Sequence, residues 1–183
     1  MTKQENLKEI SVAIMATDGF EEVELTVPKE ELEKHGFTVH ILAEGSLLKS
    51  WNKKQWGRDF KSDALIDDAD PSRYDALILP GGVINSDRLR RNKAAIEIVK
   101  KFNAEKKLIA AICHGPQLLI EADLVKNRKM TAHHAIKTDM INAGADYQGN
   151  SVANDNNFIT AMGAEDVSNF ADHIISYLRP KDE

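Results

Sequence analysis

The length, composition and charge of this chain indicate one folded domain and exclude several classes of partner. The chain has 183 residues, 42% of them hydrophobic, which is enough for a single domain spanning residues 1–183. A formal net charge of −5 gives no electrostatic footprint for nucleic acid or an anionic membrane surface, and no apolar run approaches the roughly 20 residues of a membrane span. Residues 1–9 lack the apolar core of a secretory signal and the single cysteine cannot form an internal disulfide, so we expect a cytoplasmic protein.

The first quarter of the chain predicts a parallel β-α-β unit. Residues 10–16 are apolar and β-leaning and run into turn residues, so they predict a buried strand. A helix over residues 24–34 should close at Gly36, and Pro28 predicts either a late start or a kink in it. Residues 38–43 predict the next strand, which completes the unit.

Residues 45–70 break this pattern. Trp51, Trp56 and Phe60 are scattered among charged and amide residues without a helical period, which predicts a strand-rich excursion or hairpin. The two tryptophans suit either a subunit interface or the core.

The rest of the chain alternates strands with helices. We expect a strand at 75–79, a helix capped by Asp87 that runs to about residue 105, a strand at 107–112, a helix from Pro116, a short helix at 136–142, strands near 152 and at 158–160, and a last helix at 165–178. This alternation is typical of an α/β doubly wound sheet, whose active site lies at the carboxyl ends of the strands.

Cys113 lies at a predicted strand-to-helix corner. Unpaired N–H groups and the positive dipole end at a helix N-terminus favour a thiolate over a thiol. The pattern Ala111-x-Cys113-x-Gly115 approximates the G-x-S-x-G nucleophile elbow, with sulfur in place of oxygen. The alternative is a structural cysteine that acts as a small buried hydrophobe.

A second strand end carries Gly81 and Gly82. The pair is either a plain turn or an oxyanion hole, because glycine lets backbone N–H groups approach a reacting carbonyl oxygen closely. The N–H of His114, which follows the cysteine, would supply a second donor.

Three motifs together resemble the ThiJ/PfpI family of the class I glutamine amidotransferase-like superfamily. They are Ala-Ile-Cys-His-Gly-Pro at 111–116, Leu-Pro-Gly-Gly at 79–82 and Gly-Phe-Glu-Glu-Val-Glu at 19–24, and the resemblance covers nearly the whole chain. It implies a flavodoxin-like fold, a mostly parallel sheet with helices on both faces. It also implies that Cys113 is the nucleophile, that Glu24 is the acid meeting its sulfur, and that the protein is a homodimer or homohexamer.

The charge of Glu24 decides how it could help Cys113. An ionised carboxylate would raise the pKa of the thiol, whereas a protonated one can donate a hydrogen bond to the thiolate. Because burial favours the neutral carboxyl, we predict a coupled pair in which Glu24 holds the proton and Cys113 the charge. The alternative for Glu24 is an exposed helix charge.

The resemblance also bears on His114 and Asp87. In one branch of the family, the histidine at this position belongs to a catalytic triad whose acid comes from a neighbouring subunit, and Asp87 stands at the matching position. Alternatively, His114 points away from the cysteine and Asp87 is simply a helix cap.

The function implied is a cysteine-dependent hydrolase or lyase with a stress-protective role. It would act on a small-molecule carbonyl or peptide substrate as a protease or amidase, a glyoxalase or a deglycase. The alternative is a non-catalytic oxidative-stress sensor in which Cys113 is oxidised. We expect no cofactor.

Two segments depart from the family pattern. They are Ala132-His133-His134 and Ala161-Met162-Gly163-Ala164, and they would alter substrate preference if they border the cysteine pocket. We expect no metal, because adjacent histidines such as His133 and His134 rarely face one ion.

Overall fold

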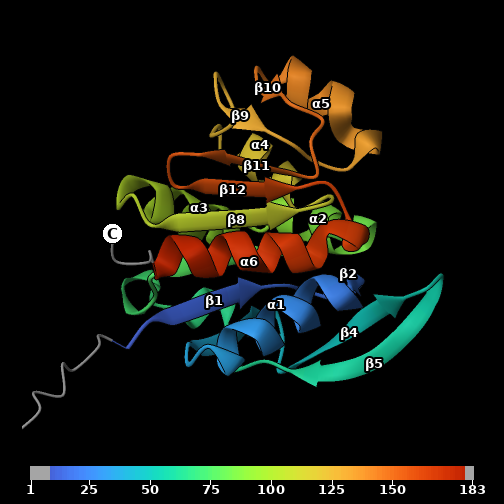
Figure 1. The fold of residues 1–183 in the computed structure, drawn as a ribbon. Coiled ribbons are helices and arrows are strands. Elements are labelled where there is room, and N and C mark those ends of the chain that lie inside the picture. Colours follow the sequence, from blue (N-terminus) through green and yellow to red (C-terminus); the bar gives the residue numbers. More distant parts are fainter. Residues whose placement is uncertain (1–8, 180–183) are drawn as a thin grey trace, which may run out of the picture.

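The computed structural model describes residues 9–179 (Figure 1). Residues 1–8 and 180–183 lie outside the described part. The expected lack of a secretory signal concerns residues 1–9, so most of that segment also lies outside it. No helix within residues 9–179 is long and apolar enough to cross a membrane.

Strands and helices alternate along the described chain. The strands are β1 Ser11–Met15, β2 Phe20–Glu21, β3 Thr38–Ala43, β4 Leu47–Asn52, β5 Gln55–Lys61, β6 Ala64–Leu65, β7 Ala76–Leu79, β8 Leu108–Ile112, β9 Lys129–Met130, β10 Asp146–Tyr147, β11 Val152–Asp155 and β12 Phe158–Ala161. The α-helices are α1 Glu22–Lys34, α2 Val83–Arg90, α3 Lys93–Ala104, α4 Pro116–Glu121, α5 Lys137–Asn142 and α6 Val167–Leu178.

The central sheet has the strand order of a flavodoxin-like fold. Among the described residues, seven strands pair in the order β11-β12-β8-β7-β1-β3-β6, and all neighbours are parallel except the β11–β12 hairpin. Taken in chain order, β3-β1-β7-β8-β12 reads 2-1-3-4-5, the flavodoxin-like order. The predicted fold class is confirmed, and the direction of winding reverses between β1 and β7.

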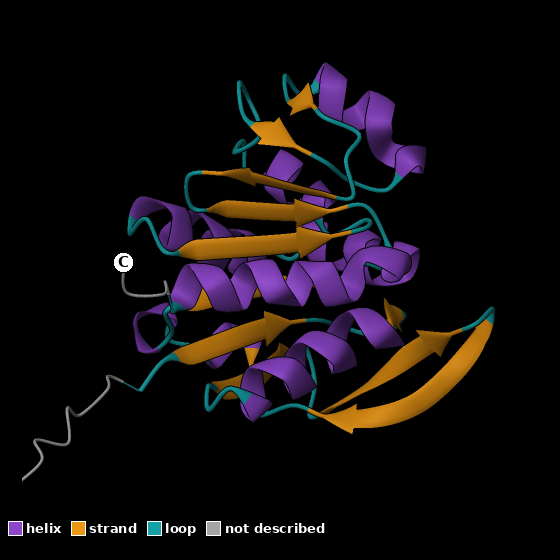
Figure 2. Cartoon of the chain, in the orientation of Figure 1, coloured by secondary structure: helices purple, strands orange, loops and turns teal. Residues whose placement is uncertain are grey.

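Both faces of the sheet are buried, as the continuous apolar runs of its strands require. Side chains alternate between the faces, so Ile14 and Ile78 pack on the face covered by α1 and α6. Met15 and Leu77 pack on the opposite face with α3 and α4. Figure 2 shows α1 and α6 together in front of the strands, and the two helices contact each other.

The β4–β5 hairpin projects beside the sheet (Figure 1). The middle of the hairpin is tied to the 19–24 motif, because the Ser50 hydroxyl donates to the Glu22 carboxylate at 2.5 Å and Arg58 pairs with the same side chain at 3.3 Å. Trp51 and Trp56 make an edge-to-face contact within the hairpin, and Trp56 is 49% exposed. The expected hairpin is confirmed, and the core assignment of the two tryptophans is wrong.

Two helix details differ from the prediction. Helix α1 starts at Glu22, before Pro28, so the late start is wrong and the alternative of a kink stays a prediction; the proline lies inside the helix and is buried. The single helix expected from Asp87 to about residue 105 is divided into α2 and α3, and the Asn92 side chain caps α3 by accepting the Ala95 N–H at 3.1 Å. Asp87 lies inside α2 and is exposed, so it is not the cap.

Candidate active site

Cys113 occupies a strained elbow between β8 and α4. Its φ of 61° is in the left-handed region, which disfavours residues other than glycine. Its N–H donates to the Ala161 carbonyl at 3.0 Å, and its carbonyl accepts the His133 N–H at 2.9 Å. A side chain at residue 115 would collide with the Leu79 carbonyl, so the elbow needs glycine there. The expected corner is confirmed, and both departing segments adjoin it.

The Gly81-Gly82 loop presses against this elbow. The Gly81 N–H donates to Glu24 Oε2 at 2.7 Å, and a Cβ at this position would lie 2.5 Å from that oxygen and 2.7 Å from the Cβ of Cys113. Gly82 has a φ of 94°, and its N–H hydrogen-bonds to the sulfur together with the N–H of His114. Of the three groups expected in an oxyanion hole, the N–H of Gly81 is therefore already occupied by Glu24.

Glu24 is buried beneath the cysteine and is 1% exposed. Burial raises the pKa of its carboxyl group to about 8, the nearby charge of Glu21 adds to the rise, and the hydrogen bond from Gly81 opposes it. Oε1 has no nitrogen or oxygen partner among the described residues. Glu24 therefore holds its proton at neutral pH, and the alternative of an exposed helix charge is wrong.

The environment of the Cys113 sulfur does not by itself produce a thiolate. Burial raises the pKa of the thiol, an ionised Glu24 raises it further, and the two backbone N–H groups lower it. Helix α4 has only six residues, so its dipole is weaker than the sequence pattern suggested. The expected low pKa is therefore contradicted. Protonation of Glu24 removes its repulsion, and the two N–H donors then remain to stabilise negative charge on sulfur.

His114 contacts the sulfur directly. Its Nδ1 lies 3.2 Å from Sγ, and its ring stacks on His133 with centroids 4.8 Å apart. Burial, and after it the charges of His133 and His134, lower the pKa of His114 to about 4. The alternative in which His114 points away from the cysteine is therefore wrong, and at neutral pH the ring meets the sulfur as a neutral imidazole.

A pocket of about 420 Å³ opens over the sulfur. Trp51, Val83 and Ile84 give it an apolar wall, and His133 also lines it. Glu21 lines it too; burial raises the pKa of this carboxyl group, and the charge of Glu22 adds to the rise. The pocket is therefore apolar on one side and carries a carboxyl group.

The sequence patterns did not reveal Asn85. This side chain is fully buried in the first turn of α2; its oxygen accepts the Thr17 N–H at 2.8 Å, and its nitrogen donates to the carbonyls of Pro80 and Gly81, each at 3.0 Å. It thereby fixes the glycine loop whose N–H groups face Glu24 and the sulfur. The one sequence feature that could have indicated this role is the position of Asn85, an amide side chain three residues after Gly82.

Asp87 and the expected absence of a metal site are the remaining predictions about the site. Asp87 is not among the pocket-lining residues of this chain. Within residues 9–179, no group of three or more His, Cys, Asp or Glu side chains is arranged to hold a metal ion. The predicted lack of a metal or cofactor stays a prediction.

Comparison with known proteins places these features in context. Residues 10–177 match the DJ-1/PfpI family. YraA of Bacillus subtilis, whose name marks it as a proposed cysteine protease, is 36% identical over 168 residues, which cover 92% of this chain and 98% of that protein. Deglycase PfpI of Pyrococcus furiosus is 37% identical over 158 residues, which cover 86% of this chain and 93% of that protein.

A solved structure from Anabaena variabilis shares the fold. That protein contains a DJ-1/ThiJ/PfpI-like domain and a ferritin-like domain, and its TM-score with this chain is 0.88 at 35% identity. The match covers 93% of this chain and 48% of that protein, so this chain spans about half the length of the two-domain relative.

Proposed function

Because this chain belongs to the DJ-1/PfpI family, we propose that it is a cysteine-dependent enzyme that converts reactive dicarbonyls and their adducts with amines. One observation carries the proposal: the Cys113 sulfur lies 3.2 Å from Nδ1 of a neutral His114 and receives the N–H groups of Gly82 and His114. A thiol, a proton acceptor and donors for a developing oxyanion are the groups that thiol addition to a carbonyl needs.

The pocket and the relatives support a deglycase or glyoxalase reaction. The relative from Pyrococcus furiosus is named a deglycase. The Glu21 carboxyl group in the pocket suits a substrate whose leaving group is an amine. A protease or amidase reaction would begin with the same thiol addition. Because the name of the relative YraA marks it as a proposed cysteine protease, the test below also includes amide and peptide substrates.

With methylglyoxal as substrate, the sulfur adds to the aldehyde carbon as the thiol proton passes by way of His114 Nδ1, which relays the proton and does not hold it. The former carbonyl oxygen receives the N–H groups of Gly82 and His114 and then takes the proton to give a hemithioacetal. A proton shift from the first to the second carbon converts it to a thioester, so one carbon is oxidised and its neighbour reduced. One water then hydrolyses the thioester, releases lactate and restores the thiol; the balance needs no external oxidant.

The test is lactate formation from methylglyoxal and amine release from methylglyoxal-treated N-acetylarginine. Wild type should turn over both, and Cys113→Ala should lose at least a hundredfold in rate. Amide and peptide substrates form the comparison set. Equal rates for wild type and Cys113→Ala, or no turnover of any of these substrates, would refute the proposal.

A second candidate is an oxidant sensor, favoured by the protonated Glu24 beside the sulfur. Two molecules of peroxide would oxidise the thiol first to a sulfenic and then to a sulfinic acid, releasing two waters, and the Glu24 proton could hydrogen-bond the sulfinate. Mass spectrometry after mild peroxide treatment separates the two functions. Clean sulfinate without any turnover supports the sensor, and turnover that Cys113→Ala abolishes supports the enzyme.

Assembly and cellular role complete the proposal. We propose a homodimer or homohexamer in which Asp87 of a second copy completes a triad with His114, because Asp87 is exposed on α2. A monomer with full activity, established by sedimentation and turnover at the same concentration, would overturn this part. A stress-protective role in the reducing cytoplasm fits a protein whose single cysteine must stay reduced to act.

A further inference from the structure

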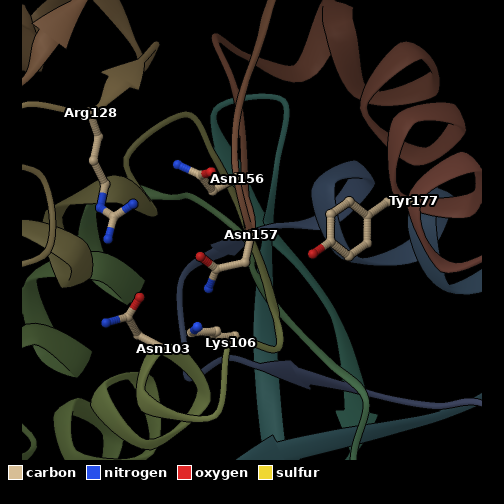
Figure 3. Close-up of a pocket in the computed structure, with 6 residues that line it drawn as sticks. All are labelled: Asn103, Lys106, Arg128, Asn156, Asn157 and Tyr177. Atoms are coloured by element: carbon tan, nitrogen blue, oxygen red, sulfur yellow. The ribbon is translucent and has the colours of Figure 1, made fainter.

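A second pocket lies away from Cys113, where the loop before β8, the β11–β12 turn and the end of α6 meet (Figure 3). Its volume is about 620 Å³. Six side chains line it: Asn103, Lys106, Arg128, Asn156, Asn157 and Tyr177. In Figure 3 the polar ends of Arg128, Asn103 and Asn157 converge on a common hollow, and the Tyr177 hydroxyl points toward Asn157.

The lining of this pocket is cationic and contains no carboxylate. Within residues 9–179, neither Lys106 nor Arg128 forms an ion pair, although the whole chain carries a net charge of −5. A third pocket, lined in part by Arg90 and Lys100, offers a contrast. There Arg90 pairs with Glu121 at 3.2 Å and Lys100 with Glu97 at 3.0 Å, so the lining includes two carboxylates, although Arg91 and Lys93 also line it without an ion pair among the described residues.

Local contacts hold the polar groups of the second pocket in place. The Arg128 guanidinium lies 4.4 Å from the centroid of the buried Phe158 ring, a cation–π contact that restricts it without neutralising its charge. The Asn157 amide nitrogen donates to the Lys107 carbonyl at 2.9 Å.

Two carboxylates next to lining residues in sequence already have partners. Glu105, which precedes Lys106, pairs with Lys107 at 2.7 Å. Asp155 Oδ1 accepts from the Asn156 amide at 2.6 Å, and Oδ2 accepts the Lys129 N–H at 2.8 Å. Asp155 does not line the pocket. The positive charge of Lys106 and Arg128 is therefore left for a ligand.

We propose that this pocket binds a small organic phosphate that carries hydroxyl groups, such as a sugar phosphate. Arginine and lysine side chains are the groups that recognise phosphate oxygens. Three carboxamides and a phenol supply both donors and acceptors, which suits hydroxyl groups, and the volume exceeds what an inorganic phosphate fills. The site is independent of the chemistry proposed for Cys113.

Isothermal titration of the full chain with glucose 6-phosphate, inorganic phosphate and glucose tests this assignment. Glucose 6-phosphate should bind more tightly than inorganic phosphate, glucose should not bind measurably, and the affinity should fall as salt is raised. Arg128→Gln and, separately, Lys106→Gln should each weaken glucose 6-phosphate at least fivefold. Circular dichroism and turnover, which should match wild type, establish that each variant is folded.

Lys100→Gln, which removes a lysine already paired with Glu97 in the third pocket, is the matched control and should bind as wild type does. The inference is overturned if glucose 6-phosphate does not bind, or if both pocket variants bind it as wild type does. Equal affinity for inorganic phosphate and glucose 6-phosphate would overturn the assignment of an organic ligand.

Discussion

Replacing Glu24 by glutamine should make the fold more stable than wild type as the pH rises from about 4.5 to about 8. Burial raises the pKa of the Glu24 carboxyl group from 4.5 to about 8 in the folded protein, and the charge of Glu21 adds to the rise. Between these pH values the unfolded chain has lost the proton and the folded chain keeps it, so the wild type loses stability as the pH rises. Below the window both states are protonated, and above it both are ionised.

The size of the effect follows from the two pKa values. At about 1.4 kcal/mol for each pH unit, the rise from 4.5 to about 8 corresponds to about 5 kcal/mol in the free energy of unfolding. This figure is a ceiling, because water and local movement can relieve an ionised carboxylate. Glutamine keeps an oxygen that can accept the Gly81 N–H and has no charge to bury.

Urea unfolding followed by circular dichroism at pH 5, 6, 7 and 8 measures the effect. The difference in unfolding free energy between Glu24→Gln and wild type should grow steadily across the series. Glu97→Gln, on α3 with a side chain 70% exposed, is the control and should differ from wild type by a small constant amount. A Glu24→Gln difference that stays constant with pH would refute the reasoning.

The same variant reports on the cysteine. Burial raises the pKa of the Cys113 thiol, and an ionised Glu24 raises it further. Glutamine removes the charge of Glu24 and leaves the burial of the sulfur, so the thiol should titrate at a lower pH in Glu24→Gln than in wild type. An unchanged titration, followed by the ultraviolet absorbance of the thiolate, would show that the two groups are not coupled.

Three further substitutions test the supports of the site. Gly81→Ala places a Cβ 2.5 Å from Glu24 Oε2 and should lower the free energy of unfolding in urea by about 1–3 kcal/mol, with loss of turnover. A variant as stable as wild type would contradict the close approach of the glycine to Glu24. Asn85→Ala leaves buried polar groups of the glycine loop unpaired and should cost about 2–4 kcal/mol by the same measurement, and a change below about 0.5 kcal/mol would argue against its positioning role. His133→Phe keeps an aromatic ring stacked on His114 but removes the charge of His133, which is the largest cause after burial of the lowered pKa of His114. An NMR titration should therefore show a higher pKa for His114 in this variant. An unchanged or lower pKa would contradict the coupling of the two rings.

Much of the fold is encoded locally, because strands buried on both faces leave a strong pattern. Residues 38–43 form β3 as expected, and the strand expected at 107–112 starts one residue later, at Leu108. Helix ends were harder, because several residues near them could cap a helix. Asp87 and Asn92 are both capable N-caps, but α2 starts at Val83, directly after Gly82, so Asp87 lies inside it and Asn92 caps α3.

Several members of the candidate site and the proton on Glu24 are predictable from the sequence, but Asn85 and the protonation of Cys113 and His114 are not. The order of motifs along the chain indicates that Cys113 and the glycine loop meet at one sheet edge, because parallel strands end together. Protonation depends instead on burial and on contacts between distant segments. His114 and His133 are nineteen positions apart, and nothing in either motif shows that their rings stack and that the contact helps to keep His114 neutral.

These charges distinguish the two functions physically. At neutral pH Glu24 keeps its proton, His114 is neutral and burial favours the thiol, so the groups around the sulfur carry little charge before a substrate arrives. Oxidation by peroxide requires a standing thiolate, which this burial opposes. In the proposed addition to a carbonyl, the thiol proton passes by way of His114 to a substrate oxygen that faces the N–H groups of Gly82 and His114, so no standing thiolate is needed. The electrostatics therefore support the proposed carbonyl chemistry over oxidation by peroxide.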